Sequence, residues 1–119
     1  MRRTLAAAAV VALATAGLTG CSNSDGTSGS NSGSTSVRIT IKNGKVTPNG
    51  DRVKAKVGKP ITLNIDADTA GEIHVHSTPE QELTYKAGTT DLPLTIDQPG
   101  LVDVESHTLD MVIVQLEVR

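Results

Sequence analysis

Apolar and polar residues alternate in short runs from residue 37 to the end of the chain. Successive side chains of a β-strand point to opposite faces of the sheet, so this period of two predicts strands with one buried face. The runs occupy residues 37–42, 53–57, 61–66, 73–76, 81–86, 93–97, 101–106 and 112–118. Turn-forming residues separate them, and no long stretch carries the apolar period of a helix. The pattern predicts a small all-β sandwich or barrel of about seven or eight strands.

Two histidines lie one residue apart in the run 73–76. Ile73 and Val75 take the apolar positions, so His74 and His76 are expected to share the opposite face, about 6–7 Å apart along the strand. Imidazole binds both zinc and copper, so two histidines on one strand face can hold an ion. The simpler alternative is that both are solvated residues on the wet face of a sheet.

A third histidine and a methionine lie between the last two predicted strands. His107 is followed four residues later by Met111. With Val112 and Val114 assigned to the core, the alternation predicts that Met111 and Ile113 point outward. Histidine and methionine together suit copper. Alternatively, Met111 fills a gap in the core beneath a loop.

The first 20 residues have the features of an export signal. Two arginines precede an apolar stretch from Leu5 to Gly17, which is too short to span a bilayer as a settled helix. The stretch leads into LTGC, Leu18–Cys21, which resembles the lipobox of bacterial lipoproteins. The resemblance implies that residues 1–20 are removed and that Cys21 carries acyl chains such as palmitate. The protein would then be anchored at the extracytoplasmic face of the cell membrane. The alternative is an ordinary secretory signal with an unrelated cysteine.

A polar segment rich in serine and glycine separates Cys21 from the predicted strands. It has no apolar residue to offset the entropy of ordering, so residues 21–36 are expected to form the lipidated cysteine and a flexible tether. Residues 37–119 then form one domain. Without the leader the chain has nine basic and 13 acidic residues, a net charge of −4, and a single aromatic residue, Tyr85. This composition gives no basic footprint or stacking surface for nucleic acid.

The predicted domain resembles the cupredoxin-like family over nearly all of residues 37–119. Three segments carry the resemblance: VKAKVGKPITLNI at 53–65, EIHVH at 72–76 and PGLVDVESHTLDM at 99–111. The resemblance implies a small antiparallel or mixed Greek-key β-sandwich. It also implies a metal site at one end, built from the strand that carries EIHVH and from the loop before the last strand.

The resemblance implies a set of metal ligands. The family's upstream histidine corresponds to His74 or His76, its loop histidine to His107 and its axial methionine to Met111. The family's cysteine is missing, and Val104 is the nearest match to its position. A blue-copper centre depends on a short copper–thiolate bond, so electron transfer through such a centre is not expected. Acidic residues that could add an oxygen ligand are Asp68, Glu72 and Glu105.

Two functions follow from these observations. One is a lipid-anchored protein that binds copper, with zinc as the second choice, and captures it, buffers it or exchanges it with a metal-donor or acceptor protein. The other is a metal-free interaction or spacer module. The position of His107 separates them, because an ion about 2 Å from each nitrogen cannot join histidines more than about 10 Å apart. No phosphate-binding loop or catalytic triad order is present, so an enzyme is not expected.

Overall fold

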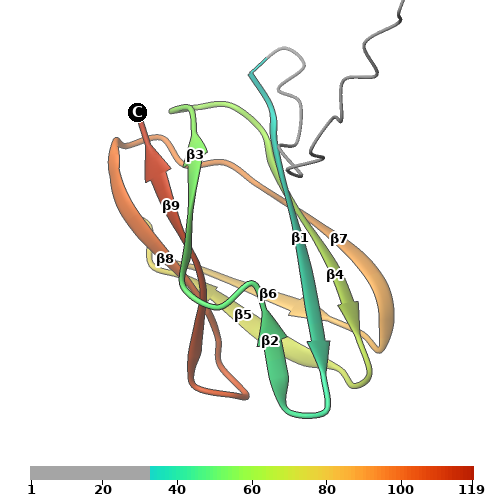
Figure 1. The fold of residues 1–119 in the computed structure, drawn as a ribbon. Coiled ribbons are helices and arrows are strands. Elements are labelled where there is room, and N and C mark those ends of the chain that lie inside the picture. Colours follow the sequence, from blue (N-terminus) through green and yellow to red (C-terminus); the bar gives the residue numbers. More distant parts are fainter. Residues whose placement is uncertain (1–32) are drawn as a thin grey trace, which may run out of the picture.

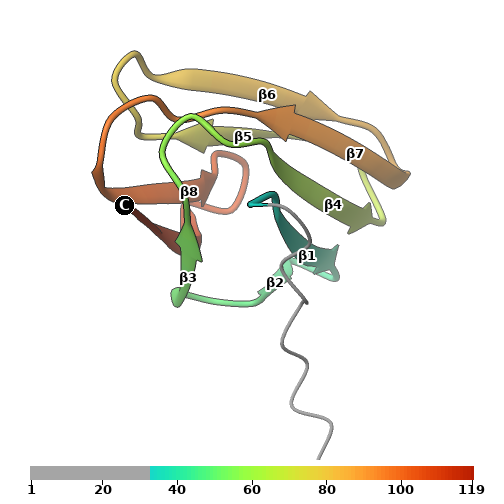
Figure 2. The same cartoon turned by 90° about the horizontal axis from the view of Figure 1, so that it is seen from above.

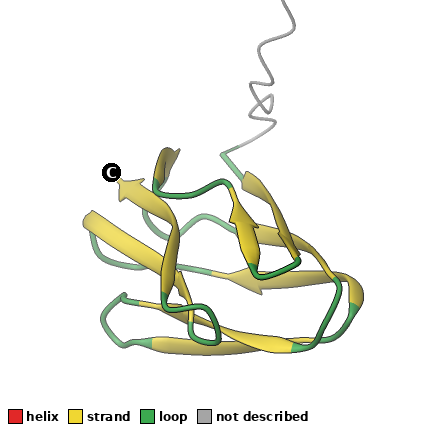
Figure 3. Ribbon diagram, turned by 60° about the horizontal axis from the view of Figure 1, so that its bottom comes forward, coloured by secondary structure: helices red, strands yellow, loops and turns green. Residues whose placement is uncertain are grey.

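The structure is a computed structural model that describes residues 33–119. The predicted signal peptide, Cys21 and most of the predicted tether lie outside the described residues. The described part consists of strands and loops (Figures 1 and 3). The strands are β1 Thr35–Lys42, β2 Lys45–Thr47, β3 Asp51–Ala55, β4 Ile61–Ala67, β5 Gly71–Val75, β6 Gln81–Tyr85, β7 Gly88–Leu94, β8 Gly100–Ser106 and β9 Met111–Val118. No helix in residues 33–119 is long and apolar enough to cross a membrane.

Two mixed sheets enclose the core. Sheet A has the strand order β2-β1-β4-β7, and sheet B has the order β3-β9-β8-β5-β6. Each contains one parallel pair, β1 with β4 and β3 with β9, among antiparallel neighbours. The chain passes from one sheet to the other several times, and the two sheets face each other across the interior (Figure 2). The prediction of a small all-β sandwich is therefore confirmed.

The core consists of the apolar positions of the alternating runs. Ile61, Leu63 and Ile65 of β4 and Ile73 and Val75 of β5 are all at most 1 % exposed. Burying one such side chain stabilises the folded state by about 1.5–3 kcal/mol. The polar residues between them lie on the outer face of their sheet, and this fixes which side chains of sheet B are available for a site.

Several strands differ from the predicted runs, most clearly β1, β2 and β7. β1 begins at Thr35, two residues before the expected start of the domain, so the end of the predicted tether is strand. β2 was not predicted, because three residues are too few to show a period; it pairs with β1 across a turn in which Asn43 and Gly44 have positive φ. β7 lies at Gly88–Leu94, not 93–97, although Leu94 and Ile96 are buried as expected.

The start of β9 departs from simple alternation. Val104 of β8 lies opposite Val114, whereas the next residue of β8 lies opposite Val112, so Ile113 is an extra residue in β9. A β-bulge of this kind interrupts the inward–outward alternation. Ile113 is consequently fully buried, and Met111 is half-buried and packs against the core. The prediction that Met111 and Ile113 point outward, with Val112 in the core, is wrong for this reason.

Candidate metal site

The candidate site lies on the outer face of sheet B, where β5 meets the end of β8. Because Ile73 and Val75 are in the core, Glu72 and His74 point to the outer face. β5 and β8 are antiparallel neighbours, and the residue after β8 is His107. The backbone N–H of His107 donates a hydrogen bond to the carbonyl oxygen of Glu72 at 3.1 Å. Strand pairing thus brings residues 35 positions apart in the chain together.

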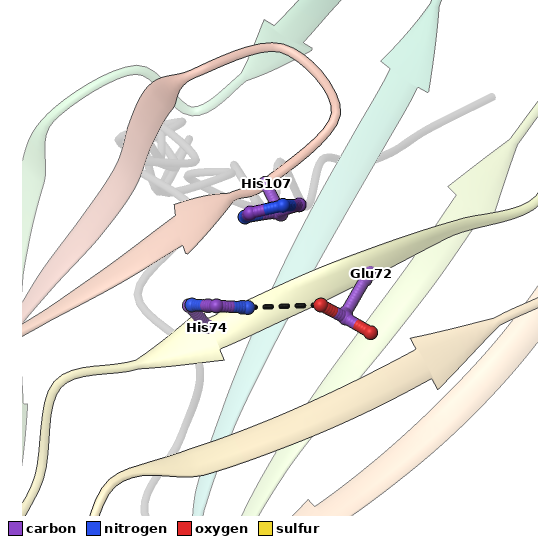
Figure 4. Close-up of side chains that lie close together, drawn as sticks. All are labelled: Glu72, His74 and His107. Carbon is purple, nitrogen blue, oxygen red and sulfur yellow. Dashed lines mark hydrogen bonds and ion pairs between the residues drawn. The ribbon is translucent and has the colours of Figure 1, made fainter.

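Three potential ligands converge there. One ligand atom from each of Glu72, His74 and His107 lies within 4.8 Å of the others (Figure 4). The imidazole rings of His74 and His107 stack with their centroids 4.5 Å apart. This distance is well below the roughly 10 Å beyond which one ion cannot join two histidines. His74 is therefore the histidine of the HVH pair that lies with His107, a choice that the sequence left open.

His74 is surrounded by carboxylates. Its Nε2 lies 2.8 Å from Glu72 and 3.6 Å from Glu82, and its Nδ1 lies 3.3 Å from Glu80. A neutral imidazole has a single N–H, so one ring nitrogen must turn a lone pair toward a carboxylate. The hydrogen bond to Glu72 raises the pKa of His74 above its ordinary value, partial desolvation opposes this, and the charges of Glu82, Glu72 and Glu80 add to it. A bound cation, either a proton or a metal ion, removes the conflict.

The stacking of the His74 and His107 rings determines what must move before both can bind one ion. The lone pair of an imidazole nitrogen lies in the ring plane, and the two planes are only 15° from parallel. An ion held by both rings must lie close to both planes, so one ring has to turn. His107 is exposed, whereas the side chain of His74 is only 17 % exposed and has carboxylates on both nitrogens. Rotation of the His107 ring is therefore the smaller change.

His76 lies beside this cluster but has different neighbours. Its ring centroid is 6.3 Å from that of His74. Its Nε2 lies 2.9 Å from Glu105, and its Nδ1 lies 3.9 Å from Glu80. His76 follows the last residue of β5, and its backbone N–H bonds to the carbonyl of Asp103 on β8, which continues the pairing of the two strands.

The other residues named from the sequence lie elsewhere. Met111 is opposite Ser106 in β8 and packs against the core, so it is on the other face of sheet B from His74. Val104, the match to the missing cysteine, is fully buried in the core. Asp68 accepts a hydrogen bond from the backbone N–H of Asn43 at 2.7 Å and is not in the group that converges with His74 and His107. Of the candidates expected to share one ion, the structure thus brings together His74 and His107, and of the three candidate acids it brings Glu72 beside them.

Two acidic neighbours of the histidines are not among the acids expected from the sequence. Glu82 lies directly opposite His74 in the β5–β6 pair, and Glu80 comes just before β6. A hairpin joining the runs 73–76 and 81–86 would have suggested the first contact. No local pattern in the sequence indicates the second, because it depends on the path of the loop between these strands.

The interior beneath the site supports the turn that carries His107. Gly71 lies opposite Tyr85 in the β5–β6 pair. A Cβ atom at Gly71 would overlap the Tyr85 hydroxyl and would lie 3.1 Å from Oγ1 of Thr108. Tyr85 is only 4 % exposed, and this burial raises the pKa of its hydroxyl. The close packing of β5, Tyr85 and Thr108 thus positions the residue next to His107.

Comparison with known proteins supports the fold. No family model and no curated protein matches the chain. Among solved structures, a copper(I) form of an amicyanin variant and a reduced copper(I) form of another at pH 4 are similar, with TM-scores of 0.54 and identities of 15 % and 16 %. Each match covers 71 % of this chain and 82 % of the amicyanin chain. A third reduced variant has a TM-score of 0.54 at 16 % identity, covering 76 % and 86 %. Since amicyanin is a cupredoxin, the domain in residues 33–119 has a cupredoxin-like β-sandwich fold.

Proposed function

We propose that the domain binds a divalent copper ion, with zinc as the second choice, through Glu72, His74 and His107. The observation that supports this is the convergence of two imidazoles and a carboxylate within 4.8 Å. Two ligands about 2.0–2.1 Å from a tetrahedral ion lie roughly 3.3 Å apart, so rotation of the His107 ring and a small closure of the three side chains are needed to bind it. Two nitrogens and an oxygen suit Cu(II) and Zn(II), and copper is favoured because it generally forms the stronger complex at such a site.

We propose capture, buffering or handover of the metal as the role of the site. His107 is exposed, and the site lies on an outer face, which suits exchange with solvent or with a second protein. The similar amicyanin structures are copper(I) forms, which supports copper as the metal. The single cysteine of the chain, Cys21, is the expected point of lipid attachment, so no thiolate ligand is proposed and neither is blue-copper electron transfer.

We also propose that this metal site is held at the extracytoplasmic face of the cell membrane. The LTGC sequence ending at Cys21 and the following serine- and glycine-rich segment support this proposal. Two or more acyl chains give stable anchoring, where one gives only marginal binding. Metabolic labelling with a radioactive fatty acid should label the wild-type protein and not Cys21→Ser. Equal labelling of both proteins would contradict the anchor without bearing on the metal site.

The metal proposal is tested by calorimetric titration of the full-length chain, purified without a histidine tag. Cu²⁺ should bind near neutral pH, and His107→Ala and Glu72→Gln should each weaken binding by about tenfold or more, as a lost ligand costs at least what a lost supporting residue does. Glu117→Gln is the matched control, because Glu117 is an outer-face carboxylate at the other end of sheet B. Absence of both Cu²⁺ and Zn²⁺ binding would overturn the proposal.

A further inference from the structure

Three lysines gather at the end of the domain where the described chain begins. A Cβ atom on Gly33, the first described residue, would lie 3.6 Å from Cγ of Lys59 and 3.8 Å from Cδ of Lys56. Two residues later, the hydroxyl of Thr35 donates a hydrogen bond to the carbonyl oxygen of Lys54 at 3.4 Å. Lys54, Lys56 and Lys59, the tether-end lysines, therefore surround the point at which the domain joins the segment that leads back to Cys21.

The tether-end lysines make no ion pair within the part of the chain that the structure describes. All three side chains are exposed. Arg119 lies at the same end, because its backbone carbonyl accepts a hydrogen bond from Val57, and its guanidinium pairs with Glu117. Asp97 lies beside Gly58 in the neighbouring turn. The side chains of the tether end thus carry four positive charges and two negative ones.

The rest of the domain has the opposite charge. Of the 11 basic and 13 acidic residues of the chain, only Arg2, Arg3 and Asp25 precede the described structure, so residues 33–119 hold nine basic and 12 acidic residues. Outside the tether end, five basic and ten acidic residues remain. The side chains therefore carry a net charge of +2 at the tether end and −5 over the remainder. An anionic surface attracts the first part and repels the second.

The candidate metal site lies at the opposite end of the domain. β8 begins at Gly100, opposite Val118, and ends at Ser106, directly before His107. A strand of seven residues is about 20 Å long. Figure 1 shows the start of β1 at the same end as the carboxyl terminus, and the turn between β8 and β9 at the other end. A domain that rests on its tether end thus holds His107 far from the surface beneath it.

We propose that the tether-end lysines lie on the anionic phospholipid headgroups of the membrane, and that this contact turns the candidate metal site away from the membrane. The inference rests on the proposed lipid attachment at Cys21, which keeps the domain near a membrane. Gly33 is 12 positions after Cys21, and 12 residues span at most about 43 Å. A connection of this length limits the distance of the domain from the membrane but does not select the end that faces it.

Surface charge selects that end. The tether-end lysines belong to β3 and the following loop and do not converge on one pocket, so they suit a plane of phosphate groups better than a single small anion. Each basic residue near an anionic membrane strengthens binding by about fivefold, and this attraction acts within a Debye length of about 10 Å at 0.1 M salt.

Vesicle binding without an acyl anchor tests the lysine surface independently of lipid attachment. The full-length Cys21→Ser chain should float with phosphatidylglycerol vesicles more strongly than with phosphatidylcholine vesicles, and 1 M salt should remove the difference. Adding Lys54→Gln, Lys56→Gln and Lys59→Gln should weaken binding to phosphatidylglycerol by about 100-fold, since three charges are lost. The leader is common to all these chains, so the change reports on the domain.

The matched control removes the same charge elsewhere. Arg38→Gln, Lys45→Gln and Lys86→Gln change exposed side chains outside the tether end and should together weaken binding by less than about fivefold. Equal weakening by the two triple variants, or equal binding of the Cys21→Ser chain to both lipids, would overturn the proposal. Neither result bears on acylation, which the fatty-acid labelling tests, and circular dichroism checks the folding of each variant.

Energy transfer measures the orientation in the acylated protein. Gln98→Cys is exposed just before β8, and Ala87→Cys is exposed at the start of β7, whose first residue lies opposite the last residue of β4. On phosphatidylglycerol vesicles with acceptor-labelled headgroups, a dye at position 98 should transfer energy more efficiently than a dye at position 87. The three glutamine substitutions of the tether-end lysines should reduce this difference. Equal transfer from both positions in the otherwise unchanged protein would show that the tether end does not face the membrane.

Discussion

The outer faces of the two sheets both carry carboxylates, but the partners of those carboxylates differ. On sheet A, Asp66 pairs with the Lys42 ammonium at 2.6 Å, and Asp91 accepts a hydrogen bond from the Asn64 amide at 2.6 Å. Around the candidate site on sheet B, the carboxylates pair with histidines. Lysine stays charged at neutral pH and amides stay neutral, whereas imidazole changes its charge and can bind a metal.

This difference indicates which surface responds to a cation. The pairs of sheet A are complete in themselves, and exposed ion pairs of this kind contribute only about 0–1 kcal/mol to stability. The cluster on sheet B is balanced only when a proton or a metal ion is bound. A ligand that binds the folded state alone stabilises it, by about 2.7 kcal/mol at 100 times its dissociation constant. Metal should therefore stabilise this protein through one face only.

The largest expected effect is the loss of copper binding when the proposed metal site loses His74. His74→Ala should weaken Cu²⁺ binding about 100-fold or more, since both a ligand and the residue that contacts three carboxylates are removed. Lys42→Ala, on the outer face of sheet A, should leave the affinity unchanged. Calorimetric titration measures both. Equal affinities for His74→Ala and wild type would remove the distinction between the two faces.

The next effect is a pH dependence of opposite sign with and without metal. The pKa of His74 is raised above its ordinary value, so in the metal-free protein the protonated ring stabilises the folded state. This stabilisation is fully present below about pH 6.5 and is lost as the pH rises through the raised pKa. A metal ion needs the neutral ring, so its affinity should fall about tenfold per pH unit below that pKa for each proton displaced. The groups that face His74 are Glu72, Glu80, Glu82 and His107.

Urea unfolding and metal titration between pH 5 and 8 check this prediction. His74→Gln should flatten the part of the metal-free stability profile that His74 produces. The same profile in His74→Gln as in wild type would show that the carboxylates around this ring do not favour its charged form.

A smaller effect is expected from the interior that supports the site. Gly71→Ala should reduce stability by about 1–3 kcal/mol, because the added methyl group overlaps the Tyr85 hydroxyl and overpacks this region. Thr84→Ala, an exposed change in the same strand as Tyr85, should have little effect. Urea denaturation compares the two. An unchanged midpoint for Gly71→Ala would show that the turn carrying His107 is not held from the interior.

The smallest effect is expected on sheet A. Asp66→Asn removes the charge partner of Lys42, and since both side chains are 46 % exposed it should lower stability by at most about 1 kcal/mol. Metal binding should be unchanged. Thermal unfolding with and without Zn²⁺ measures both quantities. If Asp66→Asn bound zinc more weakly than wild type, sheet A would contribute to the site.

Much of the fold was predictable because each strand has one buried face. The apolar positions of β4, β5 and β8 were assigned correctly, and the parity of β5 placed His74 opposite the core. The bulge at Ile113 was not predictable, because it depends on the pairing of β9 with β8, and it turned Met111 inward. Which of His74 and His76 lies beside His107 was likewise not predictable, because it depends on the path of the chain after β8 and no local sequence pattern indicates that path.

The most direct test of the central claim is a zinc titration that observes the imidazole nitrogens of the three histidines by NMR. With the first equivalent of Zn²⁺, the ¹⁵N signals of His74 and His107 should move to the positions of metal-bound rings. Those of His76 should keep the positions of a metal-free ring at this equivalent. If His76 responds first, or if His107 never responds, then Glu72, His74 and His107 do not form the principal metal site.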